Sequence, residues 1–309
     1  ICDLVPGDAR GVFKNTNLDL RRYGTMDMFI HAESRGVVDN VTDRDLFAVI
    51  RMGSDFINNF YEIKIPLRIT RWGATLDTDV WPDSNNLNLN LDRLIQLKVN
   101  RNNSGNSSGY YRELDTATNR SYAIVGNPNI GQIQALFMGV QNAGSASICT
   151  EIWFDELRLS NINDHGGYAA TGRVDLKIAD LGTMYLSGSV RSVGFGTIDQ
   201  NINQRSLSNN TQLDAATTLE LGKLLPRKAG MSIPFYASIS KSISTPEYDP
   251  YDLDINLNQK VNSAPAAQRD SIREQAVDAT TISTFNFTNV RKNNESGKKL
   301  KLWSIENFD

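Results

Sequence analysis

The stretch RVDLKIADLGTMYLSGSV, residues 173–190, holds the pattern on which the fold of this chain depends. Apolar and polar residues alternate along it, the alternation stops at residues 179–182, and it then resumes. Because successive side chains of a β-strand point to opposite sides, the pattern predicts a hairpin with one apolar and one polar face. Soluble sheets bury such an apolar face in protein, whereas membrane barrels turn it towards lipid.

The two faces of the predicted hairpin differ in residue type. The apolar face carries Val174, Leu176, Ile178, Met184, Leu186 and Val190. The polar face carries Arg173, Asp175, Lys177, Tyr185 and Arg191. Each arm runs for about 11 residues, which is the length that a tilted strand needs to cross a bilayer. By itself the hairpin favours a soluble sheet, because soluble sheets are the commoner class.

The composition argues against several kinds of partner. The 309 residues include 32 basic and 35 acidic side chains, which gives a net charge of −3. This balance leaves no basic patch for nucleic acid and no block of like charge for anionic lipid. No run approaches the roughly 18 apolar residues of a transmembrane helix. The chain begins without Met and ends within an alternating pattern, and we expect an internal piece of a longer protein.

Residues 1–160 predict a jelly-roll-like β-sandwich. Short apolar strands alternate there with clusters of Asn, Asp, Gly and Ser, which is typical of sandwich folds. In the strand expected at residues 60–70, Pro66 lacks a backbone N–H, and we expect this strand at a sheet edge. Leu91, Leu94 and Ile95 predict one short helical turn, followed by a loop at residues 100–109.

Residues 161–309 follow a different pattern, with about six longer strands of alternating residues. The connections between these strands are short, long, short, long and short, and the two long ones are residues 194–213 and 244–280. Outer-membrane barrels have short periplasmic turns and long external loops, which produces this rhythm. The last strand is expected at residues 299–308. Residues 264–277 predict a surface helix or a disordered loop with helical bias.

The loop lengths also predict an orientation in the membrane. If the turn at residues 179–182 is periplasmic, the strand before it enters the membrane from outside. The sandwich of residues 1–160 then lies on the cell surface, and residues 161–309 lie in a bacterial outer membrane.

The two cysteines, Cys2 and Cys149, lie far apart in the chain and lack the spacing of metal ligands. Two interpretations stay open for them. They are either buried thiols or a disulfide that joins the first and last strands of one domain.

No catalytic, metal or cofactor site is expected. His31 and His165 are the only histidines, and neither has a recognisable nucleophile nearby in the sequence. Glu151 and Asp155 share a strand face, but we expect a solvated pair rather than the two carboxylates of a glycosidase. The sequence therefore indicates that the chain is not an enzyme.

Long blocks of this sequence resemble one family. EIWFDELRLSNINDHGGYAATGRVDLKIADLGTMYLSGSVRSVGFGTID, residues 151–199, closely resembles the SprA/Sov family of giant outer-membrane translocons. These proteins belong to the type IX secretion system of the Bacteroidota and serve gliding motility. The resemblance continues through TTLELGKLLPRKAGMSIPFYASISKSISTPEYDPYD and FNFTNVRK, residues 217–252 and 285–292. Upstream, the family's soluble insert is matched by residues 7–33, 50–67 and 125–142.

The resemblance implies a very large single-chain barrel of about 36 strands, of which this chain supplies about six. The family's barrel is a protein-conducting channel that opens laterally towards the membrane and passes folded cargo with a C-terminal secretion domain. Its partners are the rest of the translocon chain, a shuttle barrel and a periplasmic plug protein, together with membrane lipid. No nucleic acid partner is implied.

On this interpretation the apolar face of the hairpin faces lipid and its polar face lines the aqueous lumen. Lys241, in line with Ile239 and Ile243, conflicts with a lipid face unless its amine reaches an interface. Two other hypotheses compete with the translocon. One is a secreted, lectin-like, carbohydrate-binding sandwich followed by a second soluble β-domain. The other is a glycan-cleaving enzyme that uses Glu151 and Asp155.

Overall fold

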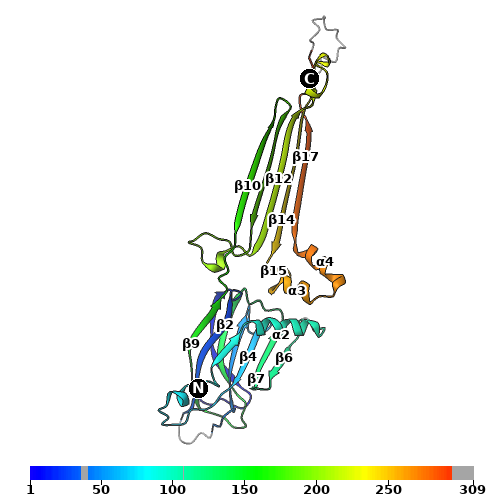
Figure 1. The fold of residues 1–309 in the computed structure, drawn as a ribbon. Helices are drawn as coiled ribbons and strands as arrows, with labels where there is room; N and C mark the ends of the chain where they lie inside the picture. Colours follow the sequence, from blue (N-terminus) through cyan, green and yellow to red (C-terminus); the bar gives the residue numbers. More distant parts are fainter. Residues whose placement is uncertain (36–40, 107, 294–309) are drawn as a thin grey trace. The chain divides into compact units, whose positions relative to one another are not determined.

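The computed structural model describes residues 1–35, 41–106 and 108–293 (Figure 1). The chain divides into two compact units. The first, here the sandwich unit, comprises Ile1–Asp164 and Tyr251–Ile255. The second, here the sheet unit, comprises His165–Pro250 and Asn256–Asp309. Both units are built mainly from β-strands in antiparallel sheets.

The sandwich unit contains a six-stranded and a three-stranded antiparallel sheet. The six-stranded sheet has the order β1-β8-β3-β4-β7-β6. Its strands are β1 (Ala9–Leu18), β3 (Leu46–Gly53), β4 (Phe60–Pro66), β6 (Tyr111–Asp115), β7 (Arg120–Val125) and β8 (Ile133–Asn142). The three-stranded sheet has the order β5 (Leu87–Asn90), β2 (Tyr23–Ser34), β9 (Thr150–Ile162). Two helices, α1 (Asp77–Val80) and α2 (Asp92–Asn103), complete the unit.

One hydrophobic core joins the two sheets of the sandwich unit. Met28 and Ile30 of β2 belong to the same buried cluster as Ile63 and Ile65 of β4. These residues recur with period two, so alternate side chains of each strand enter the core. Burying each of them contributes about 1.5–3 kcal/mol to folding.

The position of strand β4 differs from the edge position that Pro66 predicted for it. It lies inside the six-stranded sheet between β3 and β7, so the expected edge position is wrong. Pro66 is the last residue of β4 and pairs with Phe47 of β3, whereas the pairing with β7 covers residues 60–64. The missing N–H of Pro66 therefore lies beyond the ladder with β7 and removes no hydrogen bond from it.

Helix α2 is longer than the expected single turn. It continues to Asn103, so residues 100–103 are helical rather than part of the expected loop. Leu94 and Leu97 are fully buried, and Lys98 and Arg101 are buried beside them. The helix thus packs a polar as well as an apolar set of side chains into the unit.

The buried amine of Lys98 fixes a distant segment, residues 251–255, within the sandwich unit. Its Nζ donates to Asp252 Oδ1 at 2.6 Å and to Asp254 Oδ2 at 2.9 Å. Asp254 also accepts from the Tyr61 hydroxyl at 2.8 Å and from the Ile130 N–H at 2.6 Å. Burial raises the pKa of the Asp254 carboxyl above its usual range, and the nearby ammonium opposes this shift.

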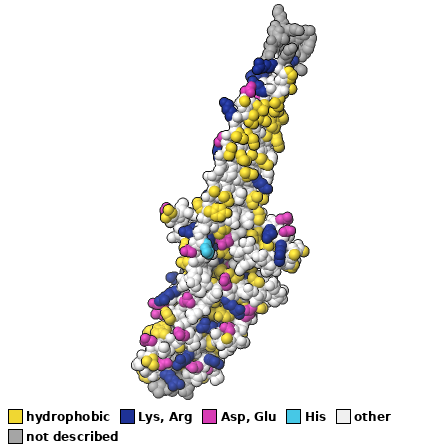
Figure 2. All heavy atoms as spheres, in the orientation of Figure 1, with side chains coloured by type: hydrophobic (Ala, Val, Ile, Leu, Met, Phe, Trp, Pro, Cys, Tyr) yellow, Lys and Arg dark blue, Asp and Glu magenta, His cyan; other side chains and the backbone are white. Residues whose placement is uncertain are grey.

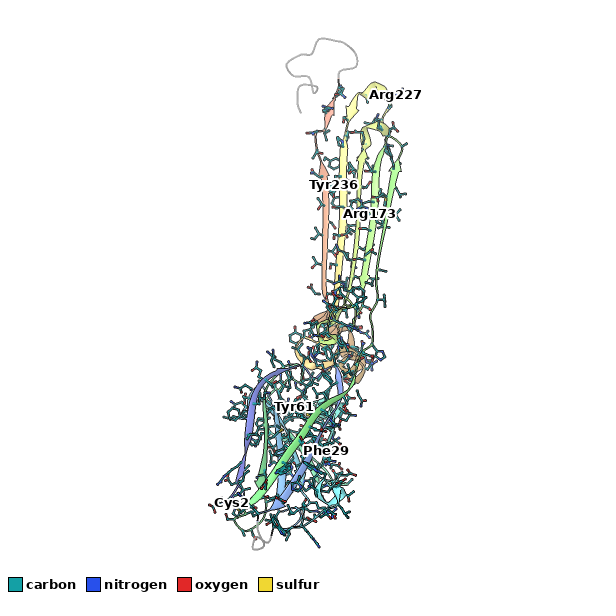
Figure 3. The ribbon with its side chains drawn as sticks, turned by 90° about the vertical axis from the view of Figure 1, so that its left-hand side faces the viewer. Cys2, Phe29, Tyr61, Arg173, Arg227 and Tyr236 are labelled. Carbon is teal, nitrogen blue, oxygen red and sulfur yellow. A yellow bond between two sulfur atoms is a disulfide. The ribbon has the colours of Figure 1, made fainter. Side chains whose placement is uncertain are left out.

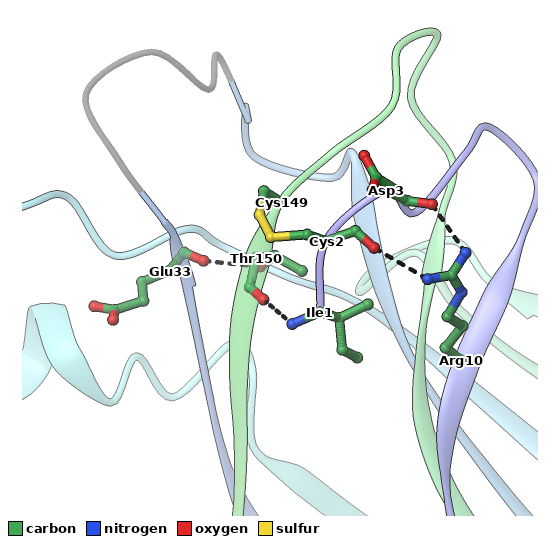
Figure 4. The surroundings of a disulfide bond; sticks show 7 residues. All are labelled: Ile1, Cys2, Asp3, Arg10, Glu33, Cys149 and Thr150. Atoms are coloured by element: carbon green, nitrogen blue, oxygen red, sulfur yellow. Dashed lines mark hydrogen bonds between the residues drawn. A yellow bond between two sulfur atoms is a disulfide. The ribbon is translucent and has the colours of Figure 1, made fainter.

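A disulfide joins Cys2 to Cys149 at the start of β9 (Figure 4). Next to the disulfide, the Ile1 amino group donates to the Thr150 carbonyl at 2.8 Å. The Arg10 guanidinium donates to the carbonyl of Cys2 at 3.0 Å and to that of Asp3 at 2.9 Å. The N-terminal segment is therefore held to β9 by the disulfide and to β1 by Arg10.

The sheet unit is dominated by one five-stranded antiparallel sheet of order β10-β11-β12-β14-β17 (Figure 1). Its strands are β10 (Ala169–Ile178), β11 (Gly182–Arg191), β12 (Ser208–Glu220), β14 (Pro234–Pro246) and β17 (Asp278–Phe287). Strands β12, β14 and β17 extend into the long connections expected at 194–213 and 244–280. The sixth strand, expected at residues 299–308, lies outside the described residues.

Short elements fill the connections of the sheet unit. The shortest are η1 (Ile202–Gln204), η2 (Leu221–Leu224), η3 (Arg227–Ala229), β13 (Met231–Ser232), β15 (Tyr248–Asp249) and β18 (Arg291–Lys292). The helices α3 (Leu257–Ser263) and α4 (Ala266–Ala276) follow β16 (Asp252–Asn256), and α4 confirms the predicted surface helix. Within the described residues, no sheet closes on itself.

No helix in residues 1–35, 41–106 and 108–293 combines the length and the apolar character that are needed to cross a membrane.

Candidate functional site: a sheet with one apolar and one polar face

The register of the five-stranded sheet aligns side chains into rows that run across all of its strands. The pairs are antiparallel and in register from β10 to β17. A central row, taken in the order of the strands, contains Val174, Leu186, Ala215, Ile239 and Ser283. Because alternate residues point to opposite sides, each row belongs wholly to one face.

The face that contains this row is apolar from here to the end of the sheet at the turn between β10 and β11. The next row contains Leu176, Met184, Thr217, Ala237 and Phe285. The row after it contains Ile178, Gly182, Leu219, Phe235 and Phe287. We call these three rows the apolar face. Hydrophobic side chains gather along this sheet in the view of Figure 2.

The apolar face is exposed rather than buried against other elements. The exposed fractions are 52% for Val174, 48% for Ile239 and 73% for Phe285. A contiguous apolar surface of this kind is unusual for a soluble monomer and marks contact with membrane or protein.

The opposite side, the polar face, carries charged, hydroxyl and amide groups. Arg173 forms an ion pair with Asp175 at 2.9 Å, and its guanidinium lies 5.1 Å from the ring centre of Tyr185. The Ser240 hydroxyl donates to Asp214 Oδ1 at 2.5 Å. Arg173 and Tyr236 of this face are labelled in Figure 3. The polar groups of neighbouring strands thus hydrogen-bond to one another.

A shallow hollow of about 310 Å³ opens over β10, β11 and β12 where the side chains are small. Its lining includes Thr171, Ser187 and Ser189, with Arg173 and Asp214 at its margin. The small hydroxyl side chains leave a polar surface that is open to solvent over these three strands.

Lys241 lies on the same side of the sheet as the apolar face, in the row between Val174's row and the row that contains Val190 and Ile243. Its row contains Gly172, Gly188, Leu213, Lys241 and Thr281. Its neighbours in this row are Leu213 and Thr281. The long aliphatic stem of a lysine can lie along the sheet while its amine reaches water. In the row of the apolar face that is farthest from Lys241, the rings of Phe235 and Phe287 lie 4.9 Å apart.

The hairpin residues fall on the two faces as follows. Val174, Leu176, Ile178, Met184, Leu186 and Val190 share one side of the sheet. Arg173, Asp175, Lys177, Tyr185 and Arg191 share the other. Of the apolar residues of β12, β14 and β17, only Ile239 and Ile243 were placed on this side from the sequence, although the same alternation marks Leu219, Phe235 and Phe285. Only the register shows that they continue one surface.

The comparisons with known proteins bear on what this surface serves. Residues 1–261 match the family model SprA_N, described as motility related/secretion protein. This match spans most of the chain. The chain belongs to the SprA_N family. No curated protein matches it.

The SprA_N match confirms the resemblance that the sequence blocks indicated. It covers the sandwich unit and, in the sheet unit, strands β10, β11, β12 and β14. Its description concerns secretion and motility. The two-faced sheet therefore belongs to a protein of a secretion and motility system.

Proposed function

We propose that this SprA_N chain is a section of an outer-membrane translocon that exports folded proteins in type IX secretion and gliding motility. In this proposal the five-stranded sheet is part of the wall of a very large barrel. The apolar face contacts lipid, and the polar face lines the aqueous channel through which cargo passes. The observation that carries the proposal is that the register of five strands places most of the large aliphatic and Phe side chains on one face and most of the charged ones on the other.

The energetics of a membrane support this assignment of the faces. An Arg or Lys on the lipid side costs about 2–4 kcal/mol at the midplane, whereas charges in a wet lumen cost little. Arg173, Asp175 and Lys177 all lie opposite the apolar face. Lys241 lies on the apolar side and fits this assignment if its amine reaches an interface. The charged side chains of β10 thus lie on the face where a charge costs less free energy.

The free edges of the sheet support a larger assembly. Among the described residues, β10 and β17 are the outermost strands of the five-stranded sheet. An unpaired strand edge is not tolerated in hydrocarbon, because its N–H and C=O groups lack partners there. We therefore infer that both edges pair with further strands of the parent barrel.

The sandwich unit is proposed to lie on the cell surface, joined to the barrel wall. Short connections such as the turn between β10 and β11 belong to the periplasmic side, and the long connections belong outside. The proposed partners are the remaining barrel chain, a shuttle barrel, a periplasmic plug and cargo with a C-terminal secretion domain.

A secreted lectin-like protein is the competing function, and the apolar face weighs against it. Such a protein would need a second layer of protein over Val174, Leu186 and Ile239. These side chains are between 43% and 52% exposed. The described part of the chain supplies no such layer.

Photocrosslinking in living cells tests the proposed function. A photoreactive amino acid is placed in the parent chain at Ser187 on the polar face, or at the adjacent Leu186 on the apolar face. The proposal predicts adducts with secreted cargo from position 187 and none from position 186. Cargo adducts from neither position, or equally from both, would contradict it.

A further inference from the structure

A small cavity outside the two-faced sheet lies on the outer surface of the three-stranded sheet of the sandwich unit. Its volume is about 90 Å³. Its lining includes Asp27 and Phe29 of β2, Asn88 of β5, and Glu156 and Arg158 of β9. Phe29 alternates with the buried Met28 and Ile30, so it points away from the core. Phe29 thus brings an outward-facing ring to the cavity, whereas the core residue Met28 also lines it.

Asn86 lines the cavity and has a buried side-chain acceptor without a partner among the described residues. The residue is 7% exposed. Its Nδ2 donates weakly to Asp83 Oδ1 at 3.4 Å, while its Oδ1 is buried and makes no hydrogen bond to any residue in the described part of the chain. A buried acceptor left unpaired costs about 1–3 kcal/mol, so a ligand that donates a hydrogen bond here recovers this free energy.

Strand β9 has a bulge beside the cavity, and Glu156 and Arg158 near this bulge line the cavity. The pairing of β2 with β9 shifts register between Asp27 and Phe29, which places a bulge in β9. Glu156, in this bulge, has a positive φ of 53°, which is unusual for a residue with a side chain. Glu156 forms an ion pair with Arg158, whose guanidinium lies 5.8 Å from the ring centre of Phe29. Bulges commonly re-aim side chains at functional sites.

Three aromatic rings continue the surface beside the cavity, and we call them the aromatic platform: Phe29, Trp81 and Trp153. The Phe29 and Trp81 rings lie 6.2 Å apart, and those of Trp81 and Trp153 lie 6.5 Å apart. Trp153 is 53% exposed and Phe29 is 39% exposed. The His31 ring packs against both tryptophan rings. A hydrogen bond of 2.7 Å between His31 Nδ1 and the Val80 carbonyl holds the His31 ring in place.

We propose that the cavity and the aromatic platform form a binding site for a neutral oligosaccharide. A pyranose ring has an apolar C–H face that stacks on an aromatic ring, and hydroxyls at its edge that donate and accept hydrogen bonds. Phe29 and the platform supply the stacking surface. Asn86 Oδ1 accepts from a sugar hydroxyl, and Asp27, Asn88 and Arg158 surround it with further donors and acceptors.

Charge and ring geometry favour a neutral sugar over other ligands. The carboxylates of Asp27 and Glu156 outnumber the guanidinium of Arg158, which disfavours acidic glycans and phosphates. The platform rings pack edge to face, so they leave no cage for a lone ammonium group. A polypeptide with basic side chains is the alternative that the experiment must separate.

Calorimetric titration of the full chain in detergent tests this site. The probes are maltohexaose, chitohexaose and mannohexaose at millimolar concentration, with a lysine-rich peptide as the comparison ligand. At least one hexasaccharide is expected to bind. Asn86→Ala is expected to weaken that binding about tenfold, because one buried hydrogen bond is lost. Since Asn86 Oδ1 has no partner among the described residues of the free protein, the melting temperature of the variant should stay close to the original.

Two further variants complete the experiment. Phe29→Ala should abolish binding through loss of stacking. Trp72→Ala is the matched control, because Trp72 is 82% exposed and belongs to neither the platform nor the cavity lining. The proposal is overturned if no hexasaccharide binds, if Asn86→Ala and Trp72→Ala bind alike, or if only the peptide binds. None of these outcomes depends on whether the sheet unit lines a translocon.

Discussion

Asp254 carries an unusual share of the contacts inside the sandwich unit, although it lies far along the chain. Its carboxylate accepts from Lys98, Tyr61 and the Ile130 N–H, and it is fully buried. Burial also raises the pKa of the Tyr61 hydroxyl well above its usual range, helped by the negative charge of Asp254. Asp254, Lys98 and Tyr61 therefore form one buried hydrogen-bond network, in which the loss of one group removes a hydrogen-bond partner from another.

Removing the Asp254 carboxylate should lower the stability of the fold, because the buried ammonium of Lys98 then loses an ion-pair partner. In Asp254→Ala, Lys98 loses its fully buried partner and the unfolding free energy is expected to fall by about 3–5 kcal/mol. Denaturant unfolding of the full chain measures this. Asp252→Ala is the control and should cost clearly less, since Asp252 is 14% exposed and Lys98 keeps Asp254. Equal losses in the two variants would show that Asp254 has no special role.

Asp55 gives the sandwich unit a pH-dependent turn between β3 and β4. Its pKa is lowered to about 2, chiefly by the hydrogen bond from the Asn58 N–H. The Ile57 and Asn59 N–H groups also donate to Asp55 Oδ1, at 2.8 and 3.1 Å. A carboxylate with a lowered pKa stabilises the fold above its unfolded pKa, and this contribution disappears as the pH falls towards the folded value.

We therefore expect the turn to loosen between the ordinary pKa of 3.8 and the folded value of about 2. Amide hydrogen exchange of residues 57–59 should accelerate across this interval relative to the exchange of β4. Asp55→Ala should show fast exchange already at neutral pH. If its exchange matches that of the unaltered chain above pH 3.8, the carboxylate does not hold the turn.

Among the elements, the strands were the most predictable part. Alternation alone assigns the hairpin residues to two faces, because the period of a strand is two whatever solvent it meets. The solvent itself cannot be deduced from one hairpin. It took the register of five strands to show that the apolar residues form one continuous exposed surface.

Other elements escaped prediction for definite physical reasons. The strand of residues 60–66 was expected at an edge because of Pro66, but the proline falls past the end of the β7 ladder. Helix α2 was underestimated because its buried positions include Lys98 and Arg101, which a hydrophobic pattern counts as exposed. The proposed saccharide site depends on the bulge at Glu156 and on an unpaired Asn86 oxygen, and neither has a sequence signature.

Strand β11 offers a matched test of its two faces. Leu186 and Ser187 are neighbours that point to opposite sides of the sheet. Leu186→Arg should impair membrane assembly of the parent chain, because the charge costs about 2–4 kcal/mol on a lipid face. Ser187→Arg introduces the same side chain into the lumen and should assemble normally. Heat-modifiable migration on gels and the amount in the outer membrane report the difference.

The test on β11 has a clear contrary result. If Ser187→Arg fails to assemble while Leu186→Arg succeeds, the faces are reversed. If both variants assemble equally well, the apolar face is not in contact with lipid.

At the scale of the whole molecule, family membership and the two edge strands of the sheet support the proposed function. The chain belongs to a secretion and motility family, and its five-stranded sheet ends in two edge strands. A sheet of this size does not enclose a channel, so the proposed pore needs strands from elsewhere in the parent protein. The sandwich unit then offers an exposed aromatic surface in the same protein.

The most direct test of the central claim is spin-label accessibility along β11 in lipid. Single cysteines replace residues 183–190 in turn in the parent chain, from which the native Cys2 and Cys149 have been removed. Each is spin-labelled, and its exposure to oxygen and to a water-soluble nickel complex is measured in membranes. We predict that labels at 184, 186 and 190 prefer oxygen and labels at 185, 187 and 189 prefer nickel. Accessibility to nickel at every position, or no alternation, would contradict a lipid-facing apolar surface.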